Sequence, residues 1–277
     1  MNDGVAALFN GALPESLWTQ ARGLHYGDGV FRTLLRSAGN WIDWDAQMAK
    51  LAGDAAVLGL ESPSAAILRD EADRLVADVR DGVLKILLWR RGAARGYRGD
   101  ARDCDRLLLR YPLPVYEPSC WTQGIHAYVC GLRLSSQPQL AGIKHLNRLE
   151  QVLASRDWPN SAQEGILVAA AGSPVCGTRS NVFWVRDGRL FTPELRDYGV
   201  AGLMRDRVRV LARNMEIPIE TGSYPLQDLL NADEAFVTNS LIGVWPLRRL
   251  EGRDWHAPGA VTRRLAEALA HPVIAQI

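Results

Sequence analysis

Short apolar runs bounded by glycine and polar turns predict strands in the first 111 residues of the chain. Val83–Trp89 is one such run, and Arg106–Tyr111 is another. Gly39-Asn40 stands between two further candidate strands, Thr33–Arg36 and Trp41–Trp44, which is typical of a hairpin turn. Elsewhere apolar residues recur at helical spacing, which predicts two helices. Their apolar positions are Met48, Leu51, Ala52, Ala55 and Leu58 in one helix, and Ile67, Leu68, Leu75, Val76 and Val79 in the other.

The rest of the chain mixes the same two patterns in a different order. A turn at Asp187-Gly188 joins two apolar runs and predicts a second hairpin. The strands are expected at residues 125–130, 165–170, 181–185, 189–192 and 235–238, and the helices at about residues 147–158, 204–214 and 262–270. This order favours an α+β fold with two mixed α and β halves over one doubly wound sheet.

The segment Tyr111–Pro118 is the best candidate for a domain boundary. It holds three prolines, which lack a backbone N–H and disfavour both a helix and a central strand. We therefore expect an N-terminal α/β domain of residues 1–114. A C-terminal domain of residues 115–277 would then carry Lys144.

Composition and charge exclude several classes of partner. Lys and Arg number 32 against 31 Asp and Glu, so a net charge of +1 gives no reason to expect nucleic acid or an anionic membrane as partner. No apolar stretch approaches the roughly 20 residues that a membrane-spanning helix needs. The four cysteines lie outside any metal-binding spacing, so no metal site is expected. Reduced thiols in a cytoplasmic protein are the expected state.

Lys144 lies between a strand-like stretch and the start of a predicted helix, in the segment Leu140–Ala154. A lysine in such a place is usually a surface cation. This segment, however, resembles the cofactor-lysine segment of fold-type IV pyridoxal-phosphate enzymes, the class IV aminotransferase family. Within the family it is most similar to the aminodeoxychorismate lyases. The resemblance covers most of the chain, because further segments agree in order: Arg22–Phe31, Gly82–Ile86, Arg95–Tyr97, Ser180–Trp184 and Gly202–Arg205.

The resemblance implies that Lys144 holds pyridoxal 5′-phosphate as a Schiff base and carries protons during the reaction. Thr33 is a further candidate for handling a substrate proton. The phosphate would bind the backbone N–H groups of Gly202, Leu203 and Met204, because a helix start favours an anion. Asn239 and Ser240, which follow a predicted strand, resemble the second phosphate-binding turn; an ordinary polar strand exit explains them equally well.

Substrate carboxylates need cations, and the resemblance points to one loop for them. Arg95 and Tyr97 match the Arg-Gly-Tyr of the lyases' substrate loop, where a guanidinium can grip a carboxylate with two bonds. Tyr26 lies in a turn that, by resemblance, reaches the active site from the substrate side. Asn147 could contact the cofactor ring, and it also suits a helix N-cap.

Two positions depart from the family's pattern. Cys176 stands where the family normally places a glutamate beside the pyridine nitrogen of the cofactor. A neutral thiol gives or receives only a weak hydrogen bond, so the cofactor would be a poorer electron sink. Lys50 stands where an arginine usually binds the phosphate, and it supplies charge without the fork geometry of arginine.

These departures favour a lyase within the family. An aminotransferase must stabilise a carbanion throughout, whereas the lyase converts 4-amino-4-deoxychorismate to 4-aminobenzoate and pyruvate, a step toward folate, and gains from aromatisation. Two alternatives stay open: an aminotransferase of D- or branched-chain amino acids, and a catalytically silent relative of the same fold. The resemblance also implies a homodimer.

Overall fold

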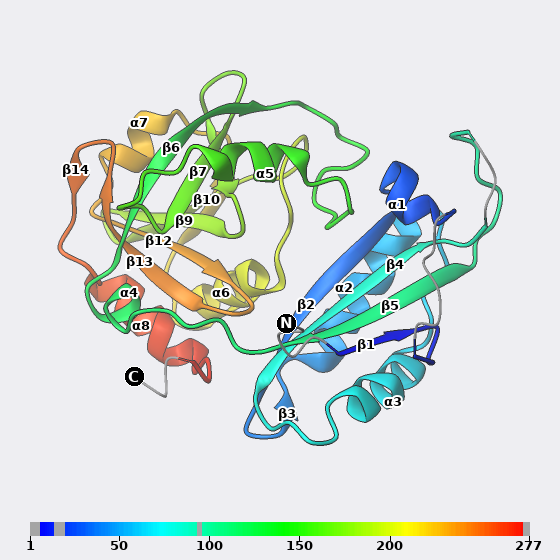
Figure 1. Ribbon diagram of the computed structural model, residues 1–277. Helices are drawn as coiled ribbons and strands as arrows, with labels where there is room; N and C mark the ends of the chain where they lie inside the picture. Colours follow the sequence, from blue (N-terminus) through cyan, green and yellow to red (C-terminus); the bar gives the residue numbers. More distant parts are fainter. Residues whose placement is uncertain (1–5, 14–19, 93–95, 274–277) are drawn as a thin grey trace. The chain divides into compact units, whose positions relative to one another are not determined.

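The computed structural model describes residues 6–13, 20–92 and 96–273 of the 277-residue chain. The chain forms two compact units. Unit 1 comprises residues 1–115 and 143–147, and unit 2 comprises residues 116–142 and 148–277. In Figure 1 the N-terminal strands and helices of unit 1 run from blue through cyan to the blue-green of β5, and unit 2 continues from green to red. Lys144 thus packs with unit 1, whereas the boundary expected from the sequence put it in the second domain.

Unit 1 is a five-stranded antiparallel sheet with two long helices. The strand order is β1-β5-β4-β2-β3. Its elements are β1 (Ala6–Phe9), α1 (Arg22–Tyr26), β2 (Gly29–Ser37), β3 (Asn40–Trp41), α2 (Trp44–Val57), α3 (Ala65–Leu75), β4 (Gly82–Arg90) and β5 (Cys104–Tyr111). The second arm of the first expected hairpin is shorter than the sequence indicated. Asp43 takes a left-handed backbone conformation, and α2 begins directly after it.

The two faces of this sheet differ in burial. Residues that alternate along the central strands, such as Leu34, Ile86 and Leu108, are fully buried in one cluster with Leu51 of α2 and Leu68 of α3. On the opposite face, the side chains at the middle of β2, β4 and β5 are only half-buried: Phe31, Thr33, Lys85, Leu87, Leu107 and Leu109. Because side chains of a strand alternate with a period of two, the helix-covered face holds the core and the other face is available for function.

Unit 2 is a mixed sheet with parallel and antiparallel pairs, in the order β11-β10-β9-β12-β13-β6-β7-β8, with β14 beside β13. Its strands are β6 (Ile125–Leu134), β7 (Glu164–Ala169), β8 (Pro174–Gly177), β9 (Asn181–Arg186), β10 (Arg189–Pro193), β11 (Ile219–Gly222), β12 (Glu234–Asn239), β13 (Gly243–Leu250) and β14 (Arg253–Asp254). Its helices are α4 (Ser119–Thr122), α5 (Leu149–Arg156), α6 (Leu203–Asn214), α7 (Leu226–Leu230) and α8 (Ala260–Leu269). Two mixed α and β units confirm the expected fold class.

The apolar run Val182–Val185 in strand β9 is explained by burial on both faces of the sheet. Val182 and Trp184 belong to one buried cluster, and Phe183 and Val185 belong to another. A strand that is buried on both faces reads as a continuous apolar run. The hairpin that β9 forms with β10 is confirmed, and both residues of its turn, Asp187-Gly188, have positive φ angles.

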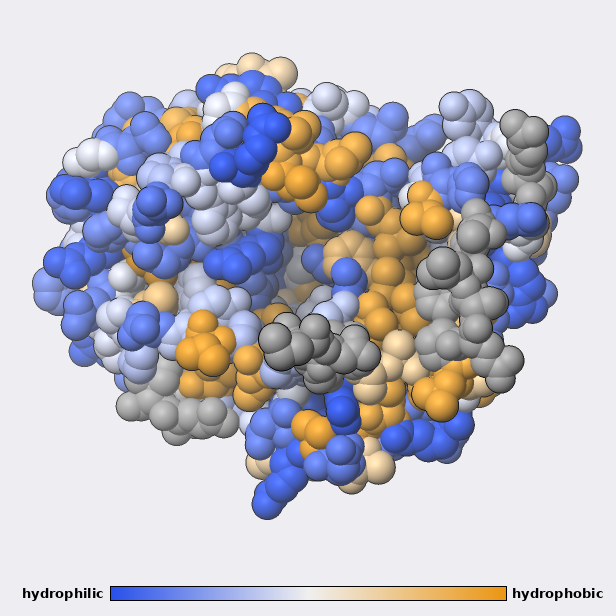
Figure 2. Space-filling view, viewed as in Figure 1, coloured by the Kyte–Doolittle hydropathy of each residue, from blue (hydrophilic) through white to orange (hydrophobic). Residues whose placement is uncertain are grey.

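Helix α5 leaves an apolar stripe uncovered. Leu149, Val152 and Leu153 lie at helical spacing and are 73%, 60% and 44% exposed. Figure 2 shows orange atoms gathered over the part of the surface where Figure 1 draws this helix. Among the helices of the described residues, none combines the length and the apolar composition that crossing a membrane requires.

We predict that Gly29→Ala destabilises the protein by about 2 kcal/mol or more, because overpacking a backbone contact forces the strand to shift. A Cβ at Gly29 would lie 2.1 Å from the Leu88 carbonyl oxygen of the neighbouring strand. Urea unfolding of variant and wild type measures the difference. The matched control is Gly53→Ala in α2, which meets nothing within 4 Å and should stabilise the helix by about 0.5–1 kcal/mol. Equal stability of Gly29→Ala and wild type would contradict the close approach.

Candidate functional site

The segment Ile143–Asn147 extends the sheet of unit 1 along the open edge of β2. Strand β3 pairs only with the far end of β2, at Arg36 and Ser37. At the near end, the Phe31 N–H donates to the Lys144 carbonyl oxygen and the Leu146 N–H donates to the Gly29 carbonyl oxygen, each at 2.9 Å. The bridge is antiparallel. Lys144 therefore lies opposite Phe31 in the register of a short extra strand.

Asp54 of α2 fixes the backbone at Lys144 from the helix side. Its carboxylate accepts a hydrogen bond from the Lys144 backbone N–H at 3.0 Å and is paired with the buried guanidinium of Arg32. Lys50 lies one helical turn before Asp54 on α2, and its side chain is half-buried. The carboxylate thus joins helix, sheet and lysine segment. A role of Lys50 in binding phosphate stays a prediction.

The half-buried face of the sheet gathers two amines and a hydroxyl. The Lys144 Nζ lies 4.5 Å from the ring centroid of Phe31, and the Lys85 Nζ lies 5.0 Å from the same centroid. Thr33 follows Phe31 on the same face of β2 and is the register partner of Lys85. The structure therefore places the two expected catalytic residues, Lys144 and Thr33, on one face and adds a second lysine to it.

Lys85 is the functional candidate that the sequence analysis did not single out. Burial lowers the pKa of its ammonium below the usual value, because desolvation penalises the charged form. The signal was present in the sequence, since Lys85 is the one charged residue in the apolar run Val83–Trp89. The chain has only three lysines, at positions 50, 85 and 144, and all three belong to unit 1.

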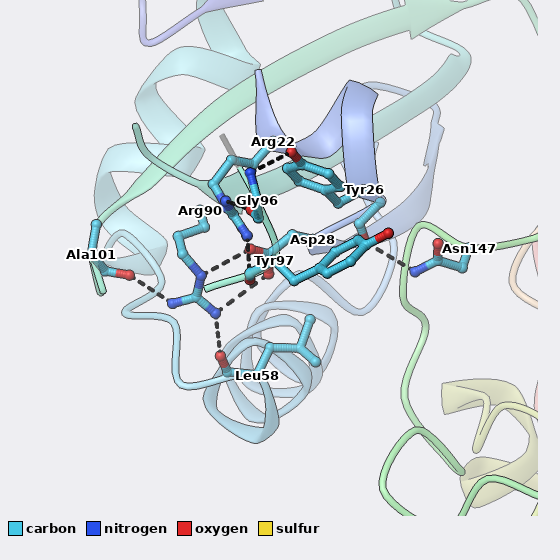
Figure 3. A network of polar contacts seen from close by, with 10 residues as sticks. Arg22, Tyr26, Asp28, Leu58, Arg90, Gly96, Tyr97, Ala101 and Asn147 are labelled. Carbon is cyan, nitrogen blue, oxygen red and sulfur yellow. Dashed lines mark hydrogen bonds and ion pairs between the residues drawn. The ribbon is translucent and has the colours of Figure 1, made fainter. Parts of the chain in front are cut away.

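The expected substrate loop is supported by the turn before β2. The Gly96 N–H donates to the Tyr26 hydroxyl at 2.9 Å, and the rings of Tyr26 and Tyr97 meet edge to face at 5.6 Å between centroids. The Tyr97 side chain is 90% exposed. Figure 3 shows this contact together with two arginines, Arg22 and Arg90, that converge on Asp28. Tyr26 thus supports the loop, and Arg95 lies outside the described residues.

Asn147 connects the lysine segment to the same turn. Its side-chain Nδ2 donates to the Gly27 carbonyl oxygen at 3.1 Å, as Figure 3 shows. The alternative that Asn147 caps a helix is wrong, because α5 begins at Leu149 with Arg148 in the cap position. The expected helix is shorter at both ends, since residue 157 already leaves it. Contact between Asn147 and a cofactor ring stays a prediction.

In unit 2, a buried carboxylate shapes the segment that follows Cys176. Glu164 is fully buried and accepts four hydrogen bonds, from the Gly165 N–H, the Thr178 N–H, the Thr178 hydroxyl and the Ser180 hydroxyl, at 2.6–3.0 Å. Cys176 itself lies in β8 and is buried. Four donors satisfy the carboxylate oxygens well, so Glu164 rigidifies the turn between β8 and β9.

Asn181 ties this turn to the start of α6. Its Oδ1 accepts from the Gly202 N–H at 3.1 Å, and its Nδ2 donates to the Val200 carbonyl oxygen at 2.8 Å. A Cβ at Gly202 would lie 2.4 Å from the Asn181 Oδ1, so this position requires glycine. The N-cap residue of α6 is Gly202, which has no side chain to cap the helix, and the backbone N–H groups of Leu203 and Met204 have no intrahelical acceptor. This helix start has the donor set that an anion needs.

The second expected phosphate turn is held by its own side chains. The Asn239 Oδ1 accepts from the backbone N–H groups of Leu241 and Ile242, and its Nδ2 donates to the Arg179 carbonyl oxygen at 3.2 Å. The His271 Nε2 lies 3.2 Å from the Ser240 carbonyl oxygen. The Asn239 side chain therefore shapes the turn and links it to the segment after Cys176. Phosphate binding by Asn239 and Ser240 stays a prediction.

Comparison with known proteins identifies a family and several relatives to which this chain is similar. Residues 29–250 match the family model described as Amino-transferase class IV. An aminodeoxychorismate lyase of Vibrio harveyi is 30% identical over 249 residues, which cover 88% of this chain and 92% of the relative. A D-alanine aminotransferase of Bacillus licheniformis is 28% identical over 98% of both chains. The crystal structure of 4-amino-4-deoxychorismate lyase from Pseudomonas aeruginosa superimposes with a TM-score of 0.91 at 36% identity, covering 97% of this chain and 100% of that one.

We predict that the stability difference between wild type and Lys85→Met depends on pH. The pKa of Lys85 in the folded protein lies below its unfolded value of 10.5, so the folded state binds fewer protons in the window between them. Wild type therefore gains stability relative to the variant as the pH rises through that window, and loses it as the pH falls. Urea unfolding at pH 7 to 10.5 measures the difference. Arg102→Met, at an exposed cation that stays charged, should show a constant difference. A constant difference for Lys85→Met would contradict the lowered pKa.

Proposed function

We propose a lyase function for this chain, which belongs to the amino-transferase class IV family. The resemblance to this family that the sequence indicated is confirmed. The reaction would be the conversion of 4-amino-4-deoxychorismate to 4-aminobenzoate and pyruvate, a step of folate biosynthesis. The observation that carries the proposal is the sheet face on which Lys144, Lys85 and Thr33 surround Phe31. On this face the Lys144 amine would bind the cofactor and transfer protons, and the Lys85 ammonium beside it would bind a carboxylate of the substrate.

Pyridoxal 5′-phosphate is the cofactor that these residues fit. Lys144 is the residue that would hold it covalently, and the start of α6, with Gly202, Leu203 and Met204, would bind its phosphate. The fit rests on Gly202, where a side chain would collide with Asn181, and on the uncapped N–H groups behind it. When bound, this cofactor supplies an electron sink conjugated to the substrate amine. Cys176 offers no carboxylate for the ring nitrogen, so that sink is weaker than in a typical aminotransferase.

Lys144 would carry the proton transfers of the reaction. Its Nζ takes the proton from C4 of the substrate ring. The bond between ring C3 and the enolpyruvyl oxygen then breaks, the ring becomes aromatic, and the methylene carbon of the leaving group receives a proton to give pyruvate. Thr33, on the same face, would hold the departing oxygen or relay this proton. The net reaction needs no oxidant or reductant.

The substrate carries carboxylates that require cations. Lys85 would bind one of them from the half-buried face, where its partly desolvated ammonium attracts an anion more strongly than in water. Arg95 and Tyr97, on the loop that Tyr26 supports, would bind the substrate from the loop side. Substrate recognition would thus involve both strand β4 and the loop that follows it.

The weaker electron sink also favours the lyase over its rivals. Aromatisation supplies driving force that an aminotransferase reaction lacks, so a lyase tolerates Cys176 better. The aminotransferase alternative keeps support from the D-alanine aminotransferase relative, whose match covers 98% of the chain. The silent-relative alternative has less support, because the backbone pairing that presents Lys144 is intact.

A cytoplasmic homodimer acting on a small molecule is the assembly that we propose. The exposed apolar stripe of α5, formed by Leu149, Val152 and Leu153, supports association with a second copy. Four buried cysteines without a disulfide are consistent with a reducing compartment.

We predict that the purified protein forms 4-aminobenzoate and pyruvate when the aminodeoxychorismate is made in place by its synthase. Lys144→Ala should lower kcat/KM by about 10³-fold, since it removes the group that moves the protons. Fluorescence of 4-aminobenzoate and coupled reduction of pyruvate measure the two products. Transamination of an amino acid with 2-oxoglutarate, without 4-aminobenzoate, would select the aminotransferase instead. Failure of both reactions, with Lys144→Ala unchanged, would support the silent relative.

A further inference from the structure

A buried cluster of two arginines and one aspartate lies beneath the expected substrate loop. The Arg22 Nε and the Arg90 Nε each lie 2.9 Å from the Asp28 Oδ2. The Arg22 side chain is 3% exposed and that of Arg90 is 12% exposed. The Asp28 carboxylate therefore pairs with both guanidinium groups, and the three residues together carry a net charge of +1 that is largely buried. The remaining guanidinium donors need acceptors of another kind.

Backbone carbonyl groups supply these acceptors, and most of them belong to the loop. Arg22 donates through Nη1 to the Gly96 carbonyl oxygen and through Nη2 to the Tyr97 carbonyl oxygen, both at 2.9 Å. Arg90 donates to the Ala101 carbonyl oxygen at 2.6 Å, and also to Leu58 of unit 1. Figure 3 shows both guanidinium groups reaching from Asp28 to these carbonyls. The loop is thus held at two places four residues apart.

We infer that Arg22, together with Asp28 and Arg90, is a positioning group that holds Gly96–Ala101 in the conformation that presents Tyr97 to substrate. The inference rests on the proposed function, because it assigns the loop a role in substrate binding. Turning the Gly96 and Tyr97 carbonyls away would break two hydrogen bonds of the buried Arg22 guanidinium, which is costly because the donor is charged. With its carbonyl held by Arg22, Tyr97 presents an exposed side chain that Tyr26 supports at the ring edge.

A glycine in the loop gives independent support for the tight fit. A Cβ at Gly99 would lie 2.6 Å from the Arg90 Cδ and 3.0 Å from the Arg22 Nε. Both guanidinium groups are fixed by several hydrogen bonds, so neither can move without losing them. The backbone of the loop therefore lies directly on the arginines, and a single added methyl group at Gly99 would lift it.

The experiment compares three variants by kinetics and by proteolysis. Arg22→Lys keeps the charge but loses the fork that binds two carbonyls at once. Gly99→Ala disturbs the same contact from the loop side and leaves every polar group in place. Arg102→Lys is the matched control, because Arg102 pairs with Glu61 on the surface outside the cluster. Lyase kinetics give KM and kcat, and trypsin followed by mass spectrometry gives the rate of cleavage after Arg98, whose side chain is 92% exposed.

The inference predicts that Arg22→Lys and Gly99→Ala each raise KM about 10-fold, with kcat within twofold of wild type. Cleavage after Arg98 should accelerate by a similar factor, and Arg102→Lys should match wild type in both measurements. Unchanged cleavage in both test variants would overturn the inference, because the loop would then not depend on the cluster. Faster cleavage with an unchanged KM would also overturn it, since the loop conformation would not matter for substrate.

The two readouts separate this inference from the proposed function. If wild-type protein lacks lyase activity, the proposed function fails, and the cleavage rates alone decide whether the cluster holds the loop. Circular dichroism would show whether Arg22→Lys unfolds. In that case Gly99→Ala still tests the contact, because it leaves Arg22, Arg90 and Asp28 unchanged. An equal fall of kcat in all three variants would indicate general damage and would contradict a positioning role.

Discussion

The pairing of Ile143–Asn147 with the open edge of β2 is the contact on which the proposed site depends. Two backbone hydrogen bonds set the register, and the register puts Lys144 opposite Phe31. A shift by one residue would turn the Lys144 side chain toward the helix-covered face of the sheet, where the buried apolar core lies. The Asp54 carboxylate secures the same register from α2. The backbone pairing of the sheet thus decides which face the Lys144 amine, proposed as the reactive group, points to.

In unit 2, side-chain hydrogen bonds hold the turns in place, where unit 1 uses backbone pairing. Glu164 holds the turn after Cys176, Asn181 joins that turn to the start of α6, and Asn239 joins it to the turn after β12. The segment around Cys176, which we propose to face the cofactor, is therefore held by polar side chains, although Cys176 stands in place of the carboxylate expected for the ring nitrogen. That combination suits a reaction that needs a precisely held cofactor but a less strongly protonated ring.

The sequence predicted those parts of the fold that depend on local pattern. The strand β4 and the hairpin of β9 and β10 followed from apolar runs and a two-residue turn, and α6 followed from its helical spacing. It could not predict the pairing of Lys144 with β2, because more than a hundred residues separate them and the lysine segment has no strand pattern. The same limit hid the contact of Lys85 with Phe31, which lies on another strand, although Lys85 itself is visible as the one charge in its apolar run. Cys176, by contrast, was visible as a departure because the motif around it is local.

The most direct test of the account is to identify which amine binds pyridoxal phosphate. The protein is incubated with the cofactor, reduced with borohydride, digested and mapped by mass spectrometry across its three lysines. The account predicts a pyridoxyl-phosphate adduct on Lys144 alone, with Lys50 and Lys85 unmodified. An adduct on Lys50 or Lys85 in place of Lys144, or no adduct at any lysine, would contradict it.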